Sequence, residues 1–225
     1  MRVQEIIPVS IRKKLLKLHQ NFIWKSTFNS YKNAIENNEK PSKALLKRLI
    51  YSWGNQGFSA QVDYLETCVN FGLSTEGTIV ECGSGLSTLV LGVIAKHKNR
   101  KMISFEHIDF WAQKIQLIMD ENQLNNILYV RKLKKYGDFE WYDIDNLEIP
   151  TIGLCICDAP PSDTLGGRRG FFNLLKDKLE SNSIILVDDT IREDEQLMIE
   201  EWKKQTPMEV NFYGSFDPHA VLKIK

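Results

Sequence analysis

The chain has 225 residues, which suits one domain of ordinary size or one domain with an appendage. Hydrophobic residues make up 43% of it, enough for a full core, which excludes the disordered and fibrous classes. With 29 basic and 29 acidic residues the formal charge is zero, so no large net field is expected to attract nucleic acid or anionic lipid.

Neither a run of 18 apolar residues nor the apolar segment of a signal peptide occurs in the sequence. The four cysteines are scattered and lack the paired spacing of a zinc site, so buried reduced thiols are expected. We therefore expect a soluble, cytoplasmic protein without a nucleic-acid or membrane partner. The oligomeric state stays open, a homodimer included.

The first 58 residues differ from the rest and are interpreted as a helical N-terminal extension. Residues 11–22 form a basic amphipathic stretch with apolar residues at helical spacing, namely Ile11, Leu15, Leu18 and Phe22. A second helix is predicted from Pro41 through Ile50. Ser59 is placed as the N-cap of a third helix, which opens a main domain over residues 59–225.

From residue 78 onward, apolar strands alternate with helices. Strands are predicted at 78–82, 102–105, 127–130, 152–157 and 183–187, and helices at 86–96, 110–119, 171–179 and 193–204. Residues 135–148 are predicted to be a polar and aromatic loop. Two closing strands, 210–213 and 221–224, have no helix between them and predict an antiparallel hairpin. The fold class is therefore α/β: a doubly wound, seven-stranded, mostly parallel sheet with an antiparallel terminal hairpin.

A glycine-rich turn follows the first strand of this sheet, in the run Glu81-Cys82-Gly83-Ser84-Gly85-Leu86-Ser87-Thr88. The two glycines allow a tight turn and a close approach of the backbone to a ligand. The helix that follows offers unpaired N–H groups at its N-terminus. Glu106 comes 21 residues after Gly85, at the exit of the second strand, where an acid can accept the ribose hydroxyls of an adenosine. His107 either lines that pocket or is an ordinary loop residue.

The residues around the two glycines distinguish between cofactors. A dinucleotide fingerprint requires a third glycine at position 88, where this chain has Thr88, and it does not require Glu81. The run instead resembles motif I of the class I S-adenosylmethionine-dependent methyltransferases. S-adenosylmethionine carries a sulfonium and an ammonium rather than a pyrophosphate, and an acid beside the turn suits these cations.

The resemblance implies a set of cofactor-binding residues: Glu81, Gly83, Ser84, Gly85, Ser87, Glu106, His107 and Asp158. Asp138, after the third strand, is a further candidate for contact with the adenine amino group. Two alternatives remain open. One is an NAD-type oxidoreductase, and the other is a binding module that keeps the fold and the cofactor but performs no chemistry.

The fourth and fifth strands also end in acids. Asp158 follows the fourth strand, and Asp188 and Asp189 follow the fifth. Crowded carboxylates repel one another unless they share a cation or a proton, and oxygen ligands suit Mg²⁺ or Ca²⁺. Alternatively, Asp188 and Asp189 cap the next helix or bond loop amides.

These strand ends resemble those of catechol O-methyltransferase and its relatives, in which an acid and an Asp-Asn pair hold a divalent metal. Here the second residue of the pair is Asp189. The resemblance implies that Asp158 and Asp188 are catalytic and that Asp158, Asp188 and Asp189 hold a metal such as Mg²⁺. The stretch Asp-Ala-Pro-Pro-Ser is superficially similar to the Asn/Asp-Pro-Pro-aromatic motif of amino-group methyltransferases, but Ala159 intrudes and the aromatic residue is missing.

Three more features bear on the substrate side. The cationic loop 166–170 is expected to close over the substrate, to attract an acidic group, or simply to lead into a helix. Trp141 and Tyr142 are expected in a loop, where aromatic rings can wall a pocket. The motifs together are similar to those of a group of small bacterial-type methyltransferases, in whose fold N-terminal extensions often form a lid. The expected activity is transfer of a methyl group from S-adenosylmethionine to a hydroxyl of a small molecule.

Overall fold

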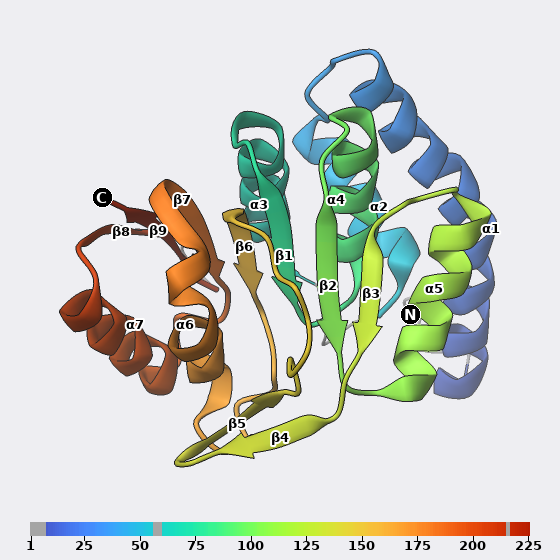
Figure 1. Cartoon of the computed structure of the whole chain (residues 1–225). Helices are drawn as coiled ribbons and strands as arrows, with labels where there is room; N and C mark the ends of the chain where they lie inside the picture. Colours follow the sequence, from blue (N-terminus) through green and yellow to red (C-terminus); the bar gives the residue numbers. More distant parts are fainter. Residues whose placement is uncertain (1–7, 56–59, 215–216) are drawn as a thin grey trace. The chain divides into compact units, whose positions relative to one another are not determined.

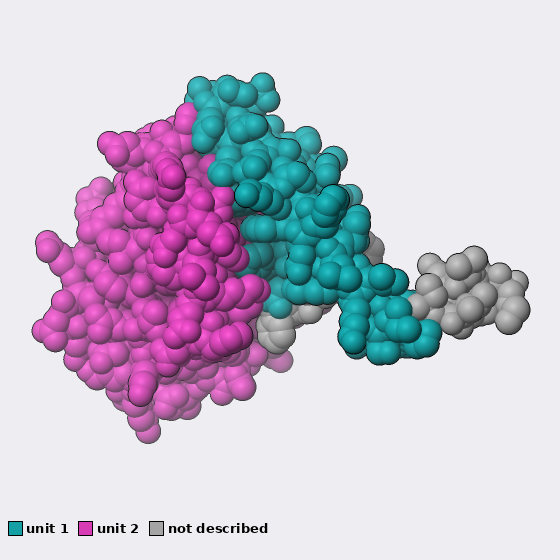
Figure 2. Space-filling view, turned by 90° about the vertical axis from the view of Figure 1, so that its right-hand side faces the viewer, with its two compact units in different colours: residues 1–62 teal, residues 63–225 magenta. Residues whose placement is uncertain are grey.

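The structure is a computed structural model that describes residues 8–55, 60–214 and 217–225. The chain divides into two compact units, residues 1–62 and residues 63–225 (Figure 2). Both the predicted boundary after residue 58 and the predicted N-cap Ser59 lie outside the described residues. The lid role of the N-terminal helices stays a prediction.

The first unit consists of two helices that pack against each other, α1 (Val9–Glu36) and α2 (Lys43–Trp53) (Figure 1). In α1, Trp24 stacks on Phe28 at 5.2 Å between ring centroids and also contacts Trp53 of α2. The Ser42 hydroxyl caps α2 by accepting from the backbone N–H of Leu45. Helix α1 is much longer than the amphipathic stretch that predicted it. The predicted stretch ended at Phe22 because the apolar residues beyond it lie on a different face of the helix.

The second unit holds a seven-stranded sheet with strand order β3-β2-β1-β6-β7-β9-β8 (Figure 1). All pairs from β3 to β7 are parallel, and β9 pairs antiparallel with both β7 and β8. The strands are β1 (Thr78–Cys82), β2 (Met102–Glu106), β3 (Ile127–Val130), β6 (Ile152–Cys157), β7 (Leu179–Val187), β8 (Met208–Tyr213) and β9 (His219–Ile224). The helices are α3 (Val62–Ser74), α4 (Leu86–His97), α5 (Asp109–Glu121), α6 (Gly170–Leu175) and α7 (Glu193–Gln205).

Both faces of the central strands are covered. Every residue of β1 and of β2 is buried, which requires apolar layers above and below the sheet. Helices α4 and α5 pack against β2 and against each other. A single hydrophobic cluster joins alternate strand residues to side chains of α6 and α7, among them Phe171, Phe172 and Trp202. The predicted doubly wound fold with its antiparallel terminal hairpin is confirmed.

A second, two-stranded sheet replaces most of the loop predicted at residues 135–148. Strands β4 (Leu133–Tyr136) and β5 (Phe139–Tyr142) pair antiparallel across a turn at Gly137, whose φ is +74°. Trp141 and Tyr142 are fully buried, and their rings contact Phe105 of β2 at 5.7 and 5.5 Å between centroids. The prediction of two loop aromatics was wrong, because these rings complete the core.

The region around α6 also differs in length from the prediction. The helix expected over 171–179 ends at Leu175, a 3₁₀ turn covers Lys176–Lys178, and β7 begins at Leu179. All four cysteines are buried and unpaired, as predicted: Cys68, Cys82, Cys155 and Cys157. Within the described residues, no helix is long and apolar enough to cross a membrane.

Candidate functional site

Three strand ends meet at one edge of the sheet, and hydrogen bonds extend beyond the paired strands there. The backbone N–H of Gly83 donates to Phe105 O over 3.0 Å, that of Asp158 to Cys82 O over 3.2 Å, and that of Asp188 to Cys157 O over 3.3 Å. The chain therefore leaves β1, β6 and β7 in register, which brings Asp158 beside the glycine turn and Asp188 one strand further along the same edge.

The two glycines of the turn have different roles. Gly83 has a φ of +95°, and a Cβ added to it would lie 2.8 Å from the Cβ of Ala159. Glycine is required there by backbone conformation and by contact with the next strand end. Gly85 has extended backbone, and a Cβ added to it would meet no atom within 4 Å. The space over Gly85 is open, as expected where a ligand approaches the backbone.

Glu81 is buried beneath the turn. Its Oε2 accepts from the hydroxyls of Ser104 and Thr88, both over 2.7 Å, while its Oε1 is buried without a hydrogen-bond partner. The same Thr88 oxygen accepts from the backbone N–H of Gly85 over 2.8 Å. Burial raises the pKa of Glu81 to about 7, although the hydroxyl donors act to lower it. Glu81 thus supports the turn and keeps one oxygen free of partners.

Glu106, at the end of β2, binds the turn from the other side. Its Oε2 accepts from the backbone N–H of Ser84 over 3.2 Å and from the Ser84 hydroxyl over 2.7 Å. Its Oε1 accepts from the backbone N–H groups of His107 and Ile108 over 2.7 and 3.0 Å. Although burial acts to raise the pKa of Glu106, these bonds hold it below its usual value. Glu106 therefore stays ionised, and four donors engage its oxygens.

The remaining predicted cofactor residues differ in how far their side chains are exposed. Ser87 is half-buried in the first turn of α4. The His107 Nδ1 lies 3.3 Å from Glu106 Oε1, and its ring contacts Tyr142 edge-on at 6.1 Å between centroids. Asp138 lies in the β4–β5 turn with 84% of its side chain exposed, 3.9 Å from Arg169. No contact in the structure supports the adenine role of Asp138, which stays a prediction.

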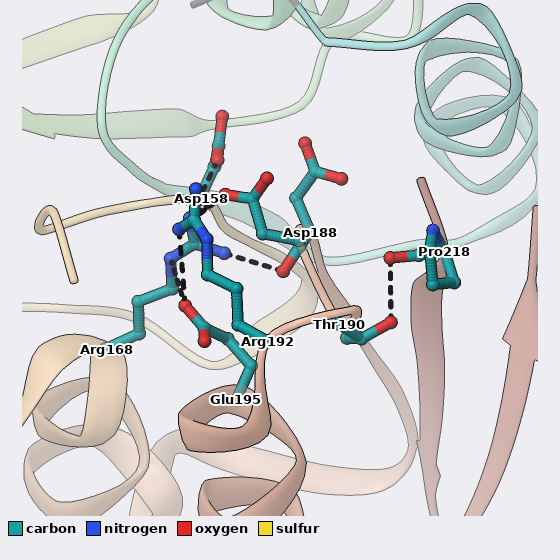
Figure 3. Close-up of polar contacts among 8 residues, drawn as sticks. Asp158, Arg168, Asp188, Thr190, Arg192, Glu195 and Pro218 are labelled. Atoms are coloured by element: carbon teal, nitrogen blue, oxygen red, sulfur yellow. Dashed lines mark hydrogen bonds and ion pairs between the residues drawn. The ribbon is translucent and has the colours of Figure 1, made fainter. Parts of the chain in front are cut away.

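The acids that follow β6 and β7 surround Arg168 of the predicted cationic loop (Figure 3). Its guanidinium donates to Asp189 Oδ2 over 2.6 Å, to Asp158 Oδ1 over 3.3 Å and to the backbone oxygen of Asp188 over 2.7 Å. The Arg168 side chain is 2% exposed. Although burial opposes its charge, Asp158 and the other neighbouring acids raise the pKa of Arg168. The loop leads into α6, and Arg168 within it is an internal cation.

Glu195 and Arg192 complete the cluster. Glu195, in the first turn of α7, is buried, and its Oε1 lies 3.8 Å from Arg168 Nε. Arg192 reaches Asp189 Oδ2 at 3.0 Å and Glu195 Oε1 at 3.6 Å. Two arginines thus face four acids: Asp158, Asp188, Asp189 and Glu195. This imbalance favours a proton on one of the carboxyl groups.

The group that keeps the proton is Asp188. Its side chain points away from the Arg168 guanidinium (Figure 3), and its Oδ1 is buried without a hydrogen-bond partner. Burial, with the charges of Asp158 and Asp189 beside it, raises the pKa of Asp188 to about 8. Asp158 is more exposed, at 37% of its side chain. Partial burial raises the pKa of Asp158 to about 6, against the opposing effect of Arg168.

The arrangement of the acids does not fit the predicted metal site. Within the described part of the chain, no group of three or more His, Cys, Asp or Glu side chains is placed to hold a metal ion. A cation that bound Asp158 and Asp189 together would have to displace Arg168, which already bonds to both. Asp189 also has a conformational reason to be Asp or Asn: its φ of +58° is left-handed, a region in which these two residues are enriched. The resemblance to a metal-binding Asp-Asn pair therefore does not extend to the metal.

Sequence reasoning missed Arg168 as a site residue because its partners lie 10 and 21 positions away, beyond any local pattern. It also missed Trp111 of α5, whose indole N–H donates to the backbone oxygen of Ser84 over 2.7 Å and fixes the outer side of the turn. In the sequence, Trp111 could be identified only as an apolar residue of a predicted helix.

The fold is shared with solved methyltransferase structures. An O-methyltransferase from Bacillus cereus, in complex with SAH (S-adenosylhomocysteine), matches with a TM-score of 0.57 and 10% identity, over 95% of this chain and 100% of that chain. A Staphylococcus aureus protein with the proposed activity of a caffeoyl-CoA O-methyltransferase matches with a TM-score of 0.59 and 13% identity, over 87% and 98%. An rRNA methylase from Streptococcus thermophilus matches with a TM-score of 0.50 and 14% identity, over 72% and 92%.

At such identities the likeness is one of fold. No protein-family model matches the sequence, and no curated protein does. The seven-stranded mixed sheet with its antiparallel terminal hairpin fits the class I methyltransferase fold. The chain therefore has the fold of the class I S-adenosylmethionine-dependent methyltransferases.

Proposed function

We propose that this protein transfers a methyl group from S-adenosylmethionine to a hydroxyl of a small molecule, with Asp188 as the general base. One observation carries the proposal. Three successive strand ends, those of β1, β6 and β7, place the glycine turn, open above Gly85, on the same edge of the sheet as a buried carboxyl group whose Oδ1 has no partner. A cofactor-binding turn and a carboxyl group that can act as a base, both at one edge of the sheet, are the minimum arrangement for transfer of a methyl group to a weakly acidic hydroxyl.

The residues of the turn fit the two ends of the cofactor. When bound, S-adenosylmethionine supplies an electrophilic methyl group on a cationic sulfur. Glu106, kept ionised by its four donors, is the acceptor for the ribose hydroxyls, and the Ser84 hydroxyl is the donor that can rotate away to admit them. The Oε1 of Glu81, which has no hydrogen-bond partner, is the acceptor that we assign to the cationic methionine end. Gly85 leaves room for the ligand against the backbone.

Asp188 and Asp158 act on the acceptor. A base is most effective when its pKa lies near the working pH, and the pKa of Asp188 is raised to about 8. The ionised Asp188 Oδ1 takes the proton of the hydroxyl as the oxygen bonds to the methyl carbon and the carbon–sulfur bond breaks. Asp158, the more exposed of the two, contacts cofactor or acceptor. Arg168 is a positioning residue that holds the backbone of Asp188 and the side chain of Asp158 in place.

The charge of the site supports a small, uncharged or cationic acceptor. Four acids face two arginines at these strand ends, and one of the arginines, Arg168, is buried. A polyanion such as a nucleic acid would meet excess negative charge there, so its phosphates would be repelled. The solved neighbours include both O-methyltransferases and an rRNA methylase, so the assignment of the acceptor rests on the electrostatics of this chain.

The test is calorimetric titration of the whole protein with S-adenosylmethionine, S-adenosylhomocysteine and NAD⁺. We expect micromolar binding of the two sulfur ligands and none of NAD⁺. Binding of NAD⁺ alone would favour the oxidoreductase alternative. Binding of the sulfur ligands by a protein that turns over none of a panel of phenols, catechols and alcohols would favour the non-catalytic module. Failure of a well-folded protein to bind any of the three would overturn the proposal.

A further inference from the structure

Helix α1 of the first unit carries two apolar faces. One face includes the buried residues Phe28, Tyr31 and Ile35, and the Trp24 ring on this side contacts Trp53 of α2. The other face consists of Ile11, Leu15, Leu18 and Phe22, here called the α1 stripe, whose side chains are 48 to 85% exposed. Four large apolar residues exposed on one helix are more than scattered surface hydrophobics, and contiguous patches of this kind mark interaction sites.

The spacing of the stripe shows that it is one continuous surface. Its residues follow one another at intervals of four, three and four, which places them in a row along one side of a helix. Trp24 comes two positions after Phe22, a rotation of about 200° around the axis. The α1 stripe therefore lies opposite the side that contacts Trp53, and packing within the first unit does not cover it.

Positive charge borders the α1 stripe. Exposed basic residues lie within about 90° of the stripe around the helix axis, namely Arg12, Lys14 and Lys25, and Lys13 and Lys17 add positive charge elsewhere on the helix surface. No Asp or Glu occurs anywhere from residue 8 to residue 35. The formal charge of zero for the whole chain conceals this local excess, because acidic residues elsewhere balance it. An expectation based on the net charge alone could not detect it.

We propose that the α1 stripe is a docking surface for an anionic lipid membrane. An apolar row flanked by Lys and Arg is the pattern of a helix that lies in the plane of a membrane interface, with its apolar side among the acyl chains and its cations near lipid phosphates. A second copy of the chain is a poorer occupant, because pairing two such helices would bring like charges together. Nucleic acid would bind the cations but leave Leu18 and Phe22 in water.

The experiment is sedimentation of the full chain with sucrose-loaded vesicles. One set contains phosphatidylcholine only, and the other contains phosphatidylcholine with about a third phosphatidylglycerol. We expect binding to the anionic vesicles, at least tenfold weaker binding to the neutral ones, and loss of binding as salt is raised. The variant L18S/F22S should reduce binding to anionic vesicles at least tenfold, and R12E/K14E, which reverses the charges on either side of the stripe, should do the same.

Matched controls use residues of the same type and exposure away from the stripe. Phe110 and Leu117 of α5 are 78 and 65% exposed, so F110S/L117S removes similar apolar surface, and K47E/R48E changes the same charge on α2. Both should bind like the wild type. Equal binding to neutral and anionic vesicles would overturn the proposal, as would equal loss in the controls. Absence of vesicle binding, with a dimer in analytical ultracentrifugation that L18S/F22S dissociates, would assign the stripe to a second copy.

Discussion

The hydroxyl of Thr88, in the first turn of α4, donates to the buried Oε2 of Glu81 over 2.7 Å. Because the same oxygen accepts from the N–H of Gly85, the glycine turn is tied through one side chain to a carboxylate in the centre of the sheet. A dinucleotide-binding turn has a glycine at the position of Thr88, where no such link can form. A change in the protonation state of Glu81 should therefore affect the hydrogen bonds that hold the whole turn.

The first prediction concerns stability and pH. The folded-state pKa of Glu81, about 7, lies above its ordinary value of 4.5, so the native state holds this proton more tightly than the unfolded state does. The free energy of unfolding should therefore fall as pH rises from about 4.5 through about 7, by on the order of 3 kcal/mol from this group. Glu81→Gln should match the wild type near pH 4.5 and be more stable above pH 7. Urea denaturation at pH 4.5, 6 and 8 measures this difference.

The control for this experiment is Asp163→Asn, which changes an exposed carboxylate. It should follow the wild-type pH dependence. A Glu81→Gln variant that lost stability in parallel with the wild type from pH 4.5 to pH 8 would show that Glu81 is already ionised at low pH.

The second prediction concerns the ribose acceptor. Glu106→Gln should weaken the binding of S-adenosylhomocysteine about 10- to 100-fold, because hydrogen bonds to a charged acceptor contribute about 1.5 to 3 kcal/mol. Adenosine alone should lose the same factor, since it keeps the ribose. Ser84→Ala should retain or improve affinity for both ligands, because it removes a competing donor from Oε2. Calorimetry with the two ligands tests each variant. Weaker binding by Ser84→Ala would mean that the hydroxyl itself contacts the ligand.

The third prediction concerns the base. With a pKa of about 8, Asp188 is mostly protonated at neutral pH, so kcat should rise with pH up to about 8 and then level off. Asp188→Asn should lower kcat by about 10²- to 10⁴-fold and abolish this rise. Its affinity for S-adenosylhomocysteine should change little, which separates lost chemistry from lost folding. A variant that keeps the wild-type pH profile would exclude Asp188 as the base.

The fourth prediction concerns the interaction between the two acids. The negative charge of Asp158 contributes to the raised pKa of Asp188, so Asp158→Asn should move the midpoint of the kcat profile to lower pH. Turnover should fall while binding of S-adenosylhomocysteine is largely kept. An unchanged midpoint would indicate that the two carboxyl groups do not affect each other.

The fifth prediction concerns the internal cation. Arg168→Met leaves Asp158 and Asp189 without their partner and should cost about 3 to 5 kcal/mol of stability, as for other buried pairs broken on one side. Arg168→Lys keeps the charge but not the planar fork, so it should cost less. Arg169→Met, at the neighbouring half-exposed position, is the control and should cost about 1 kcal/mol or less. Urea denaturation compares the three variants.

Treatment with a chelator gives a further check on Arg168. Wild-type turnover should survive removal of divalent metal, because a guanidinium already neutralises the acids that would bind it. Loss of activity in chelator, restored by Mg²⁺ alone, would contradict this and would return the metal to the site.

The sequence predicted the sheet well because its strands are continuous apolar runs. The run Ile152–Cys157 has six residues, a length typical of a buried strand and too short for most helices, and the structure keeps its bounds. The β4–β5 hairpin was missed although Gly137-Asp138 stands between two alternating segments, which is a hairpin signal. The many charged residues around it, such as Lys134 and Lys135, favoured a loop. Only the burial of Trp141 against Phe105 reveals which face of β5 is internal.

Only part of the candidate site could be predicted from the sequence, because only part of it depends on local spacing. Glu81 and Glu106 lie at fixed positions relative to the glycine turn, so their place could be read from spacing. The function of Asp158 and Asp189 depends on Arg168, which reaches them only in the folded chain. Crowded acids in a sequence indicate that a cation is needed, but they do not say whether it is a metal or a side chain.

The contact between Gly83 and Ala159 has a consequence for how such a chain can change over evolutionary time. A single Cβ at position 83 would lie 2.8 Å from the Ala159 methyl group, so neither residue can grow unless the other strand end moves. Because Asp158 precedes Ala159, the same movement would shift a predicted catalytic acid together with the cofactor turn. Residues 83 and 159 should therefore both remain small among homologues, even where the acceptor specificity has diverged.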